Sequence, residues 1–307
     1  MITGLDKYKS VFMVYDRNVE YYADKVAGES EIEASLGIDA GEAFKDMDTV
    51  LDICRFLIGM GADRDSLLLA IGGGTLTDMA GMAASIYKRG IRVAFVPTTL
   101  LSMVDAAHGG KNGVNLDGYK NVVGSFLTPE FVHTDVSLLR TLPRREFLSG
   151  AAELLKTFLI ADASLYEEGV KVLSESKPDY RSLGRLIEEA VKIKEEFVAE
   201  DPYDRGVRKK LNLGHTFAHA IEWYERTHDV GDPMTHGEAV AVGIIASAKM
   251  CNEALAARLE KDFLSCGLPV SLPYSVEELM PAMRLDKKNS GGQIRYVLLE
   301  GIGEVKI

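Results

Sequence analysis

The chain has 307 residues, of which 47% are hydrophobic, and its 46 acidic and 35 basic side chains give a formal net charge of −11. This charge argues against nucleic acid as a partner, because phosphate backbones are bound by basic surfaces. The N-terminal residues lack the apolar segment of a signal peptide, and no apolar run is long enough to span a membrane. The three widely spaced cysteines are typical of reduced residues. We therefore expect a cytoplasmic globular protein with room for two domains.

The first part of the chain alternates predicted strands with predicted helices. Short apolar runs at residues 10–16, 66–74 and 91–97 predict buried strands. Between the first two, apolar residues recur at helical spacing over 50–57, and Gly61 ends this predicted helix. Strands that alternate with helices indicate an α/β domain with a mostly parallel sheet.

The rest of the chain, from about residue 142, is dominated by helical patterns. The longest apolar stripes run through residues 149–160, 183–200 and 237–264, and strand signals fade. We therefore predict an α/β domain over residues 1–142 and an all-α domain over 143–307.

The segment "AIGGGTLTDMAG" (70–81) leads from a predicted strand into a predicted helix. Glycines allow a close approach of backbone to a pyrophosphate, and a helix N-terminus offers unpaired N–H groups. The glycines do not follow the G-x-G-x-x-G order, so a tight turn without a ligand is the alternative. Polar residues in "YDRNV" (15–19) and "VPTTLL" (96–101) end the neighbouring strands, which favours a nucleotide site there.

Charged residues interrupt apolar helical stripes in the second domain. Glu153 and Lys156 lie three residues apart in a nearly continuous apolar run, and Lys194 falls on an inward stripe. A structural ion pair explains the first two, and a lysine stem along apolar surface explains the third, unless an anion binds there. The glycine-rich stretch 105–126, which contains Lys111, is predicted to be a loop shaped around an anion, although loop lysines are usually just solvated.

Histidines raise the question of a metal. His215 and His219 are four residues apart and share one helical face, and His236 precedes another apolar helix. Together with Glu153, two of these imidazoles would form the two-histidine, one-carboxylate set of a catalytic zinc site. Core histidines satisfied by backbone groups are the alternative, and spacing alone does not decide whether both His215 and His219 bind a metal.

Taken together, the motifs resemble those of the 3-dehydroquinate synthases over nearly the whole chain. The resemblance implies a Rossmann-like NAD-binding domain, an all-α metal-binding domain with zinc (or cobalt in its place), and a cytoplasmic homodimer. It also implies conversion of 3-deoxy-D-arabino-heptulosonate 7-phosphate to 3-dehydroquinate and phosphate, the reaction of a carbon–oxygen lyase in the shikimate pathway. The motifs that carry it, in chain order, are "GGGTLTDMAG", "VPTTLLSMVDAAHGGKNGVN", "YKNVVGSF", "TLPRREFLSGAAELLK", "LNLGHTFAHAIE", "HGEAVAVG" and "MRLDKK".

The same resemblance implies roles for individual residues. The zinc ligands would be Glu153, His215 and His236, and His219 would hydrogen-bond in the active site and move protons. The NAD-binding residues would be Asp16, Asn18, Glu42, Lys45, Gly73, Gly74, Thr75, Asp78, Thr98, Thr99, Asp105, Lys111, Lys120 and Thr141. The anionic groups of the substrate would meet Lys111, Asn121, Lys156, Lys194, Arg208, Asn212 and Lys287. Arg89 would reach the substrate of the partner subunit.

The stretch "AAHGGKN" departs from the family pattern Ser-Ser-Val-Gly-Gly-Lys-Thr at Ala106, Ala107, His108 and Asn112. These changes lie close to the expected cofactor and substrate. They keep open a different sugar phosphate cyclase on the same scaffold. A metal-dependent polyol dehydrogenase is a further alternative, although it would not need so many anion-binding residues.

Overall fold

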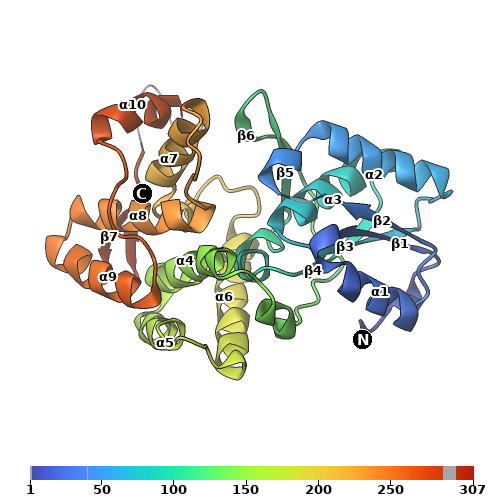
Figure 1. The fold of residues 1–307 in the computed structure, drawn as a ribbon, viewed down its shortest axis with the longest axis horizontal. Helices are drawn as coiled ribbons and strands as arrows, with labels where there is room; N and C mark the ends of the chain where they lie inside the picture. The colour runs from blue at the N-terminus through green and yellow to red at the C-terminus, as the bar shows by residue number, and fades with distance from the viewer. Residues whose placement is uncertain (1, 40, 286–294) are drawn as a thin grey trace. The chain divides into compact units, whose positions relative to one another are not determined.

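The computed structural model describes residues 2–39, 41–285 and 295–307, and Figure 1 shows the path of the chain. Its contacts divide the chain into two compact units, Met1–Thr141 and Leu142–Ile307. Among the described residues, no helix is long and apolar enough to cross a membrane.

The N-terminal unit is built on a parallel sheet of four strands in the order β2-β1-β3-β4. The three strands predicted from apolar runs are confirmed. The second strand was not predicted, because it is short, contains Gly37 and is only partly buried. The strands are β1 (Val11–Asp16), β2 (Ala34–Ile38), β3 (Leu67–Gly72) and β4 (Arg92–Pro97).

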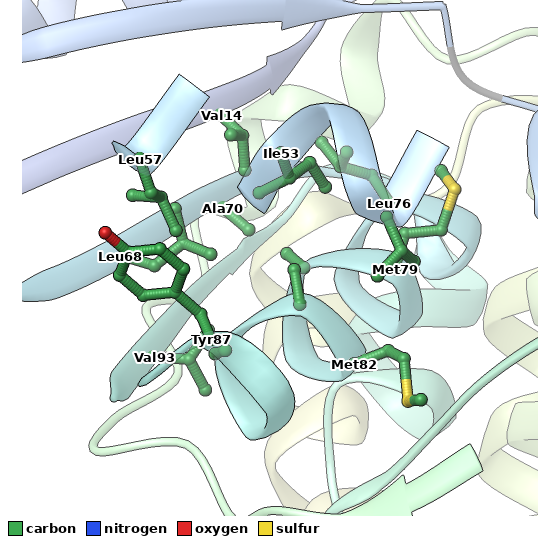
Figure 2. Packing of buried hydrophobic residues seen from close by; sticks show 14 of the residues in the cluster. Val14, Ile53, Leu57, Leu68, Ala70, Leu76, Met79, Met82, Tyr87 and Val93 are labelled. Atoms are coloured by element: carbon green, nitrogen blue, oxygen red, sulfur yellow. The ribbon is translucent and has the colours of Figure 1, made fainter. Parts of the chain in front are cut away.

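Helices cover both faces of this sheet, with α2 and α3 on one side and α1 on the other (Figure 1). β2 lies on one side of β1, whereas β4 lies on the opposite side of β3. Right-handed crossovers from β1 to β2 and from β3 to β4 therefore place α1 and α3 on opposite faces of the sheet. Figure 2 shows the resulting core, in which Val14 and Leu68 of the sheet meet Ile53 of α2 and Met79 of α3. The helices are α1 (Glu20–Glu29), α2 (Met47–Gly59) and α3 (Gly74–Ile86).

The prediction of a loop over residues 105–126 is wrong. After a short π-helical segment, η5 (Ser102–Ala106), the chain forms an antiparallel hairpin of β5 (Lys111–Leu116) and β6 (Tyr119–Phe126). Asp117 and Gly118 make the turn with φ of 49° and 81°. An Asp-Gly pair with two positive φ angles is the preferred two-residue hairpin connection. Both lysines, Lys111 and Lys120, therefore lie in a strand pair, and Gly109 and Gly110 precede it.

The C-terminal unit is mostly helical, as predicted, and departs from an all-α domain in one short antiparallel pair, β7 with β8. Helix α4 is buried along almost its whole length, because α5, α6 and α8 pack around it. The elements are α4 (Arg144–Ala161), α5 (Ala163–Leu173), α6 (Tyr180–Glu200), the 3-10 helix η7 (Val207–Asn212), α7 (His215–Thr227), α8 (His236–Lys249), α9 (Glu253–Cys266), α10 (Val276–Leu285), β7 (Leu298–Gly301) and β8 (Glu304–Lys306).

Candidate active site

Three side chains from three helices of the C-terminal unit converge on one point. Glu153 of α4, His215 of α7 and His236 of α8 each offer one ligand atom, and these atoms lie within 4.8 Å of one another. Glu153 Oε1 is 3.3 Å from His236 Nε2 and 3.7 Å from His215 Nε2. The set predicted from the sequence is therefore brought together by the fold.

Both imidazoles are oriented through their other ring nitrogen. His215 Nδ1 lies 3.2 Å from the carbonyl oxygen of Leu213, and His236 Nδ1 lies 3.0 Å from Glu222 Oε1. A proton on each Nδ1 would leave each Nε2 lone pair directed toward Glu153, as metal-ligating histidines require. Two such imidazoles and one carboxylate are a donor set that suits zinc and leaves a coordination position for a reactant.

The electrostatic environment of these residues also suits a cation. Glu153 is fully buried and forms an ion pair with Lys156, one helical turn further along α4. Burial opposes the charge on His236, but Glu222 and Glu153 outweigh it and raise its pKa to about 9. The negative potential that stabilises a proton on this imidazole would equally stabilise a divalent ion in its place.

His219 lies beside this cluster without belonging to it. Its ring is 5.5 Å from that of His215, centroid to centroid, close to the 5.3 Å between the rings of His215 and His236, so ring distance alone does not separate the two. Among the described residues, the second histidine whose ligand atom joins Glu153 and His215 is His236. The interpretation of His215 and His219 as a paired zinc clamp is therefore not supported.

Three predicted substrate-binding cations of the C-terminal unit are buried: Lys156 is 2% exposed, Lys194 6% and Arg208 3%. They come from α4, α6 and η7, which contact one another. Buried cations are costly unless anions or polar groups surround them. The fold therefore buries three positive charges on elements that pack against one another, one of which, α4, also carries Glu153.

A short loop fixes the place of Arg208. The carboxylate of Asp201 accepts hydrogen bonds from the backbone N–H groups of Arg205, Gly206 and Arg208, at 2.9, 2.6 and 3.2 Å. The Arg208 guanidinium donates to Pro202 O (2.9 Å). In the same segment, the Asn212 side chain donates a hydrogen bond to Lys209 O. Lys287, also predicted to bind the substrate, lies outside the described residues.

In the N-terminal unit, the glycine loop joins the carboxyl end of β3 to α3. A Cβ on Gly72 would lie 3.3 Å from Asp16 Cβ, one on Gly73 would lie 3.1 Å from Thr99 Cγ2, and one on Gly74 would lie 2.9 Å from Ala106 Cβ. The loop is therefore lined by the last residue of β1 and by residues that follow β4. Because the strand order reverses between β1 and β3, this is the edge where parallel α/β sheets bind nucleotides.

A polar network joins five of the predicted NAD and substrate residues beside this loop. Lys45 Nζ lies 2.5 Å from Asp78 Oδ2 and 2.7 Å from Asn121 Oδ1. Burial raises the pKa of Asp78, and Lys45 opposes that effect. Lys120 Nζ lies 3.5 Å from Glu42 Oε1, and Asn115 donates to the same oxygen (2.9 Å) and accepts from the backbone of Asn121.

The remaining predicted residues of this unit occupy separate positions. Asn18 donates both its backbone and its side-chain N–H to Asp16 Oδ1, and Thr98 is buried at the end of β4. Thr75 accepts from Gly41 N, Asp105 lies in η5, and Lys111 begins β5. Thr141 follows the 3-10 helix Val136–Arg140, and Arg89 ends the 3-10 helix Tyr87–Arg89 with φ of 69°. Their parts in binding stay predictions.

Two departures from the family pattern have a packing role. Ala107 is buried in the core of the N-terminal unit. Asn112 is also buried and donates to Gly110 O and Leu127 O, at 2.9 and 3.1 Å, across the base of the hairpin. A Cβ on Gly81 would overlap Asn112 Oδ1, so this amide packs directly against α3. Ala107 therefore contributes to the core of the N-terminal unit, and Asn112 holds the base of the hairpin.

Comparison with known proteins decides the family. Residues 35–149 match the family model of the 3-dehydroquinate synthase N-terminal domain, and residues 150–289 match that of the C-terminal domain. A 3-dehydroquinate synthase of Dictyoglomus thermophilum is 39% identical over 285 residues, 90% of this chain and 78% of the relative. The chain belongs to the 3-dehydroquinate synthase family. Its Rossmann-like domain followed by a mostly helical one is the fold expected of that family.

Solved structures of related enzymes have the same fold. The 2-epi-5-epi-valiolone synthase of Streptomyces hygroscopicus, solved with NAD+ and Zn2+, is 28% identical with a TM-score of 0.87, covering 98% of this chain and 87% of that one. A 2-deoxy-scyllo-inosose synthase, solved with carbaglucose-6-phosphate, NAD+ and Co2+, gives the same identity and TM-score, with 98% and 86% coverage.

Glu222 was missed by the sequence analysis, although its carboxylate contacts a predicted ligand. The sequence does contain an indication of its position: Glu222 lies seven residues after His215 and therefore on the same face of α7.

Proposed function

We propose that this protein is a 3-dehydroquinate synthase that converts 3-deoxy-D-arabino-heptulosonate 7-phosphate to 3-dehydroquinate and phosphate. The observation that carries the proposal is the convergence of Glu153, His215 and His236, with the buried Lys156 paired to Glu153, in a chain of this family. The proposed enzyme is a carbon–oxygen lyase, because the hydride that would be removed early in the reaction would be returned before the product leaves.

NAD and a divalent metal are the cofactors we propose. NAD would lie along the glycine loop and the Lys45–Asp78 network, and Glu153, His215 and His236 would hold zinc or cobalt. When bound, the metal lowers the pKa of a coordinated hydroxyl, and the nicotinamide accepts and returns a hydride.

The side chains of the protein would bind and orient the substrate. Lys194, Arg208 and Asn212 lie on α6 and η7, and we propose that they hold its anionic groups, together with Lys111, Asn121, Lys156 and Lys287. His219, next to the metal ligands, would move a proton. We further propose a homodimer in the cytoplasm, in which Arg89 reaches the substrate of the partner subunit.

The choice among sugar phosphate cyclases rests on two observations. The relative named 3-dehydroquinate synthase is 39% identical, whereas the valiolone and inosose synthases are each 28% identical. Ala107 and Asn112, two departures in "AAHGGKN", pack within the N-terminal unit. These departures therefore give little support to a different substrate.

The decisive experiment is incubation of the purified protein with heptulosonate phosphate, NAD and zinc. We expect release of one phosphate for each substrate consumed, without accumulation of NADH absorbance. Glucose 6-phosphate, which resembles the carbaglucose-6-phosphate of the solved inosose synthase, and a heptulose phosphate that lacks the carboxylate are offered in parallel. Turnover of either in place of heptulosonate phosphate, or steady accumulation of NADH with a polyol, would refute the proposal.

A further inference from the structure

Glu222 is a buried carboxylate that contacts one metal ligand from the helix that supplies another. It lies on α7 seven residues after His215, and two helical turns place both on the same face. The Glu222 side chain is 6% exposed, and its Oε1 is 3.0 Å from His236 Nδ1. Removing a carboxylate from water is costly, so its position calls for a specific interaction.

The imidazole of His236 bridges two carboxylates through its opposite nitrogens. Nδ1 faces Glu222 at 3.0 Å and Nε2 faces Glu153 at 3.3 Å. A hydrogen bond from Nδ1 to Glu222 fixes the tautomer in which Nε2 offers a lone pair, and the negative charge makes that lone pair more basic. At the corresponding nitrogen, His215 faces a neutral group, the backbone carbonyl of Leu213.

The start of α8 is held by contacts that do not involve Glu222. Thr235 and Glu238 form a reciprocal capping box around His236. Arg145 donates to Glu238, Asp232 and Pro233 O, and Ser149 Oγ accepts from Gly237 N at 3.0 Å. Because the backbone is already fixed in this way, the contact of Glu222 serves the orientation and basicity of the ring.

We infer that Glu222 is a positioning residue for His236, which sets the affinity of the proposed metal site. The inference rests on the metal site of the proposed function and adds a residue to it. Glu222 would hold the ring at Nδ1 and would not itself touch the metal or the substrate.

The chain offers a matched control in Glu225, one turn further along α7. It is buried to a similar degree, and its carboxylate accepts hydrogen bonds from Met234 N (2.9 Å) and from the hydroxyl of Tyr274 (3.2 Å). Glu225 therefore supports the same loop ahead of α8 without contacting a ligand. Replacing either glutamate by glutamine keeps the shape and removes the charge.

Zinc affinity of the metal-free wild type, Glu222→Gln and Glu225→Gln should be measured by competition with a chromophoric chelator. We expect Glu222→Gln to weaken binding by about 10- to 100-fold, the range found when partners of metal-ligating histidines are removed. Glu225→Gln should bind zinc as the wild type does, although its melting temperature falls. The visible absorption bands of the Co2+ form should shift in Glu222→Gln and stay in place in Glu225→Gln.

The outcomes separate this inference from the proposed function. Wild-type zinc affinity in Glu222→Gln, or an equal loss in both variants, would overturn the role of Glu222 while leaving the metal site standing. A wild type that binds no zinc would refute the metal site itself, and the role of Glu222 with it. Melting curves recorded with a chelator present show whether each variant folds.

Discussion

Gly237 is the residue at which the packing of α4 against α8 is tightest, and replacing it with alanine tests how closely the metal ligands are held. A Cβ on Gly237 would lie 2.5 Å from the carbonyl carbon of Ser149, and closer still to Ser149 O and Cα. Real Cβ atoms essentially never come within 3.0 Å of such atoms, so the two backbones must separate by more than 0.5 Å. No flexible side chain is available to yield, because the contact is with backbone.

This separation has two expected costs. Overpacking of this kind destabilises proteins by about 1–3 kcal/mol. Loss of the 3.0 Å hydrogen bond from Gly237 N to Ser149 Oγ adds about 1 kcal/mol. The free energy of unfolding should therefore fall by about 2–4 kcal/mol. Because Glu153 lies on α4 and His236 on α8, zinc affinity should fall as well, by about tenfold or more.

Urea unfolding of the metal-free protein and chelator competition for zinc measure the two effects separately. Gly231→Ala is the control, because Gly231 lies in the loop between His219 and His236 and a Cβ there meets nothing within 4 Å. It should change the free energy of unfolding by no more than about 0.5 kcal/mol. If Gly237→Ala retained the stability and zinc affinity of the Gly231→Ala protein, the reasoning from close backbone contact would be wrong.

Two further predictions concern charged residues. Lys45→Met leaves the Asp78 carboxylate, only 17% exposed, without its cation, so it should lower the free energy of unfolding by about 3 kcal/mol and weaken NAD binding. Lys25→Met, at an exposed lysine, is the control, and equal urea midpoints for the two variants would contradict the prediction. Burial opposes the charge on Glu238, but Arg145 holds its pKa below the usual 4.5, so its stabilising contribution is present above that pH and is lost as the pH falls below it. Urea midpoints of the wild type should therefore drop more steeply than those of Glu238→Gln between about pH 6 and about pH 3. Parallel curves for the two proteins would contradict this contribution of Glu238.

Sequence patterns predicted those elements whose burial is uniform. β1, β3 and β4 are continuous apolar runs because both faces of the parallel sheet are covered. β2 escaped detection because its residues are only partly buried and their exposure follows no regular alternation. The hairpin of β5 and β6 was missed because its glycines were attributed to ligand binding, although the Asp117–Gly118 pair is itself a hairpin signal.

For the candidate site, a charge within an apolar helix was the most informative signal. Glu153, Lys156 and Lys194 stand out in this way, and all three are buried. Glu222 could not be recognised by the same criterion, because α7 carries several polar residues. Its contact with His236, fourteen residues away, depends on how the loop between α7 and α8 returns the chain.

The face of α7 shows what spacing can and cannot decide. His215, His219 and Glu222 recur at i, i+4 and i+7, so the sequence alone establishes that they lie on one side of the helix. Which of them binds a metal depends on what faces that side. Glu153 approaches the N-terminal end of the helix and meets His215, and the start of α8 brings the Nε2 atom of His236 within 3.3 Å of the same carboxylate. The second histidine of the candidate metal site is therefore His236, although helical spacing alone would have suggested His219. Glu222, two turns from His215 on α7, faces the Nδ1 atom of the incoming His236 ring at 3.0 Å.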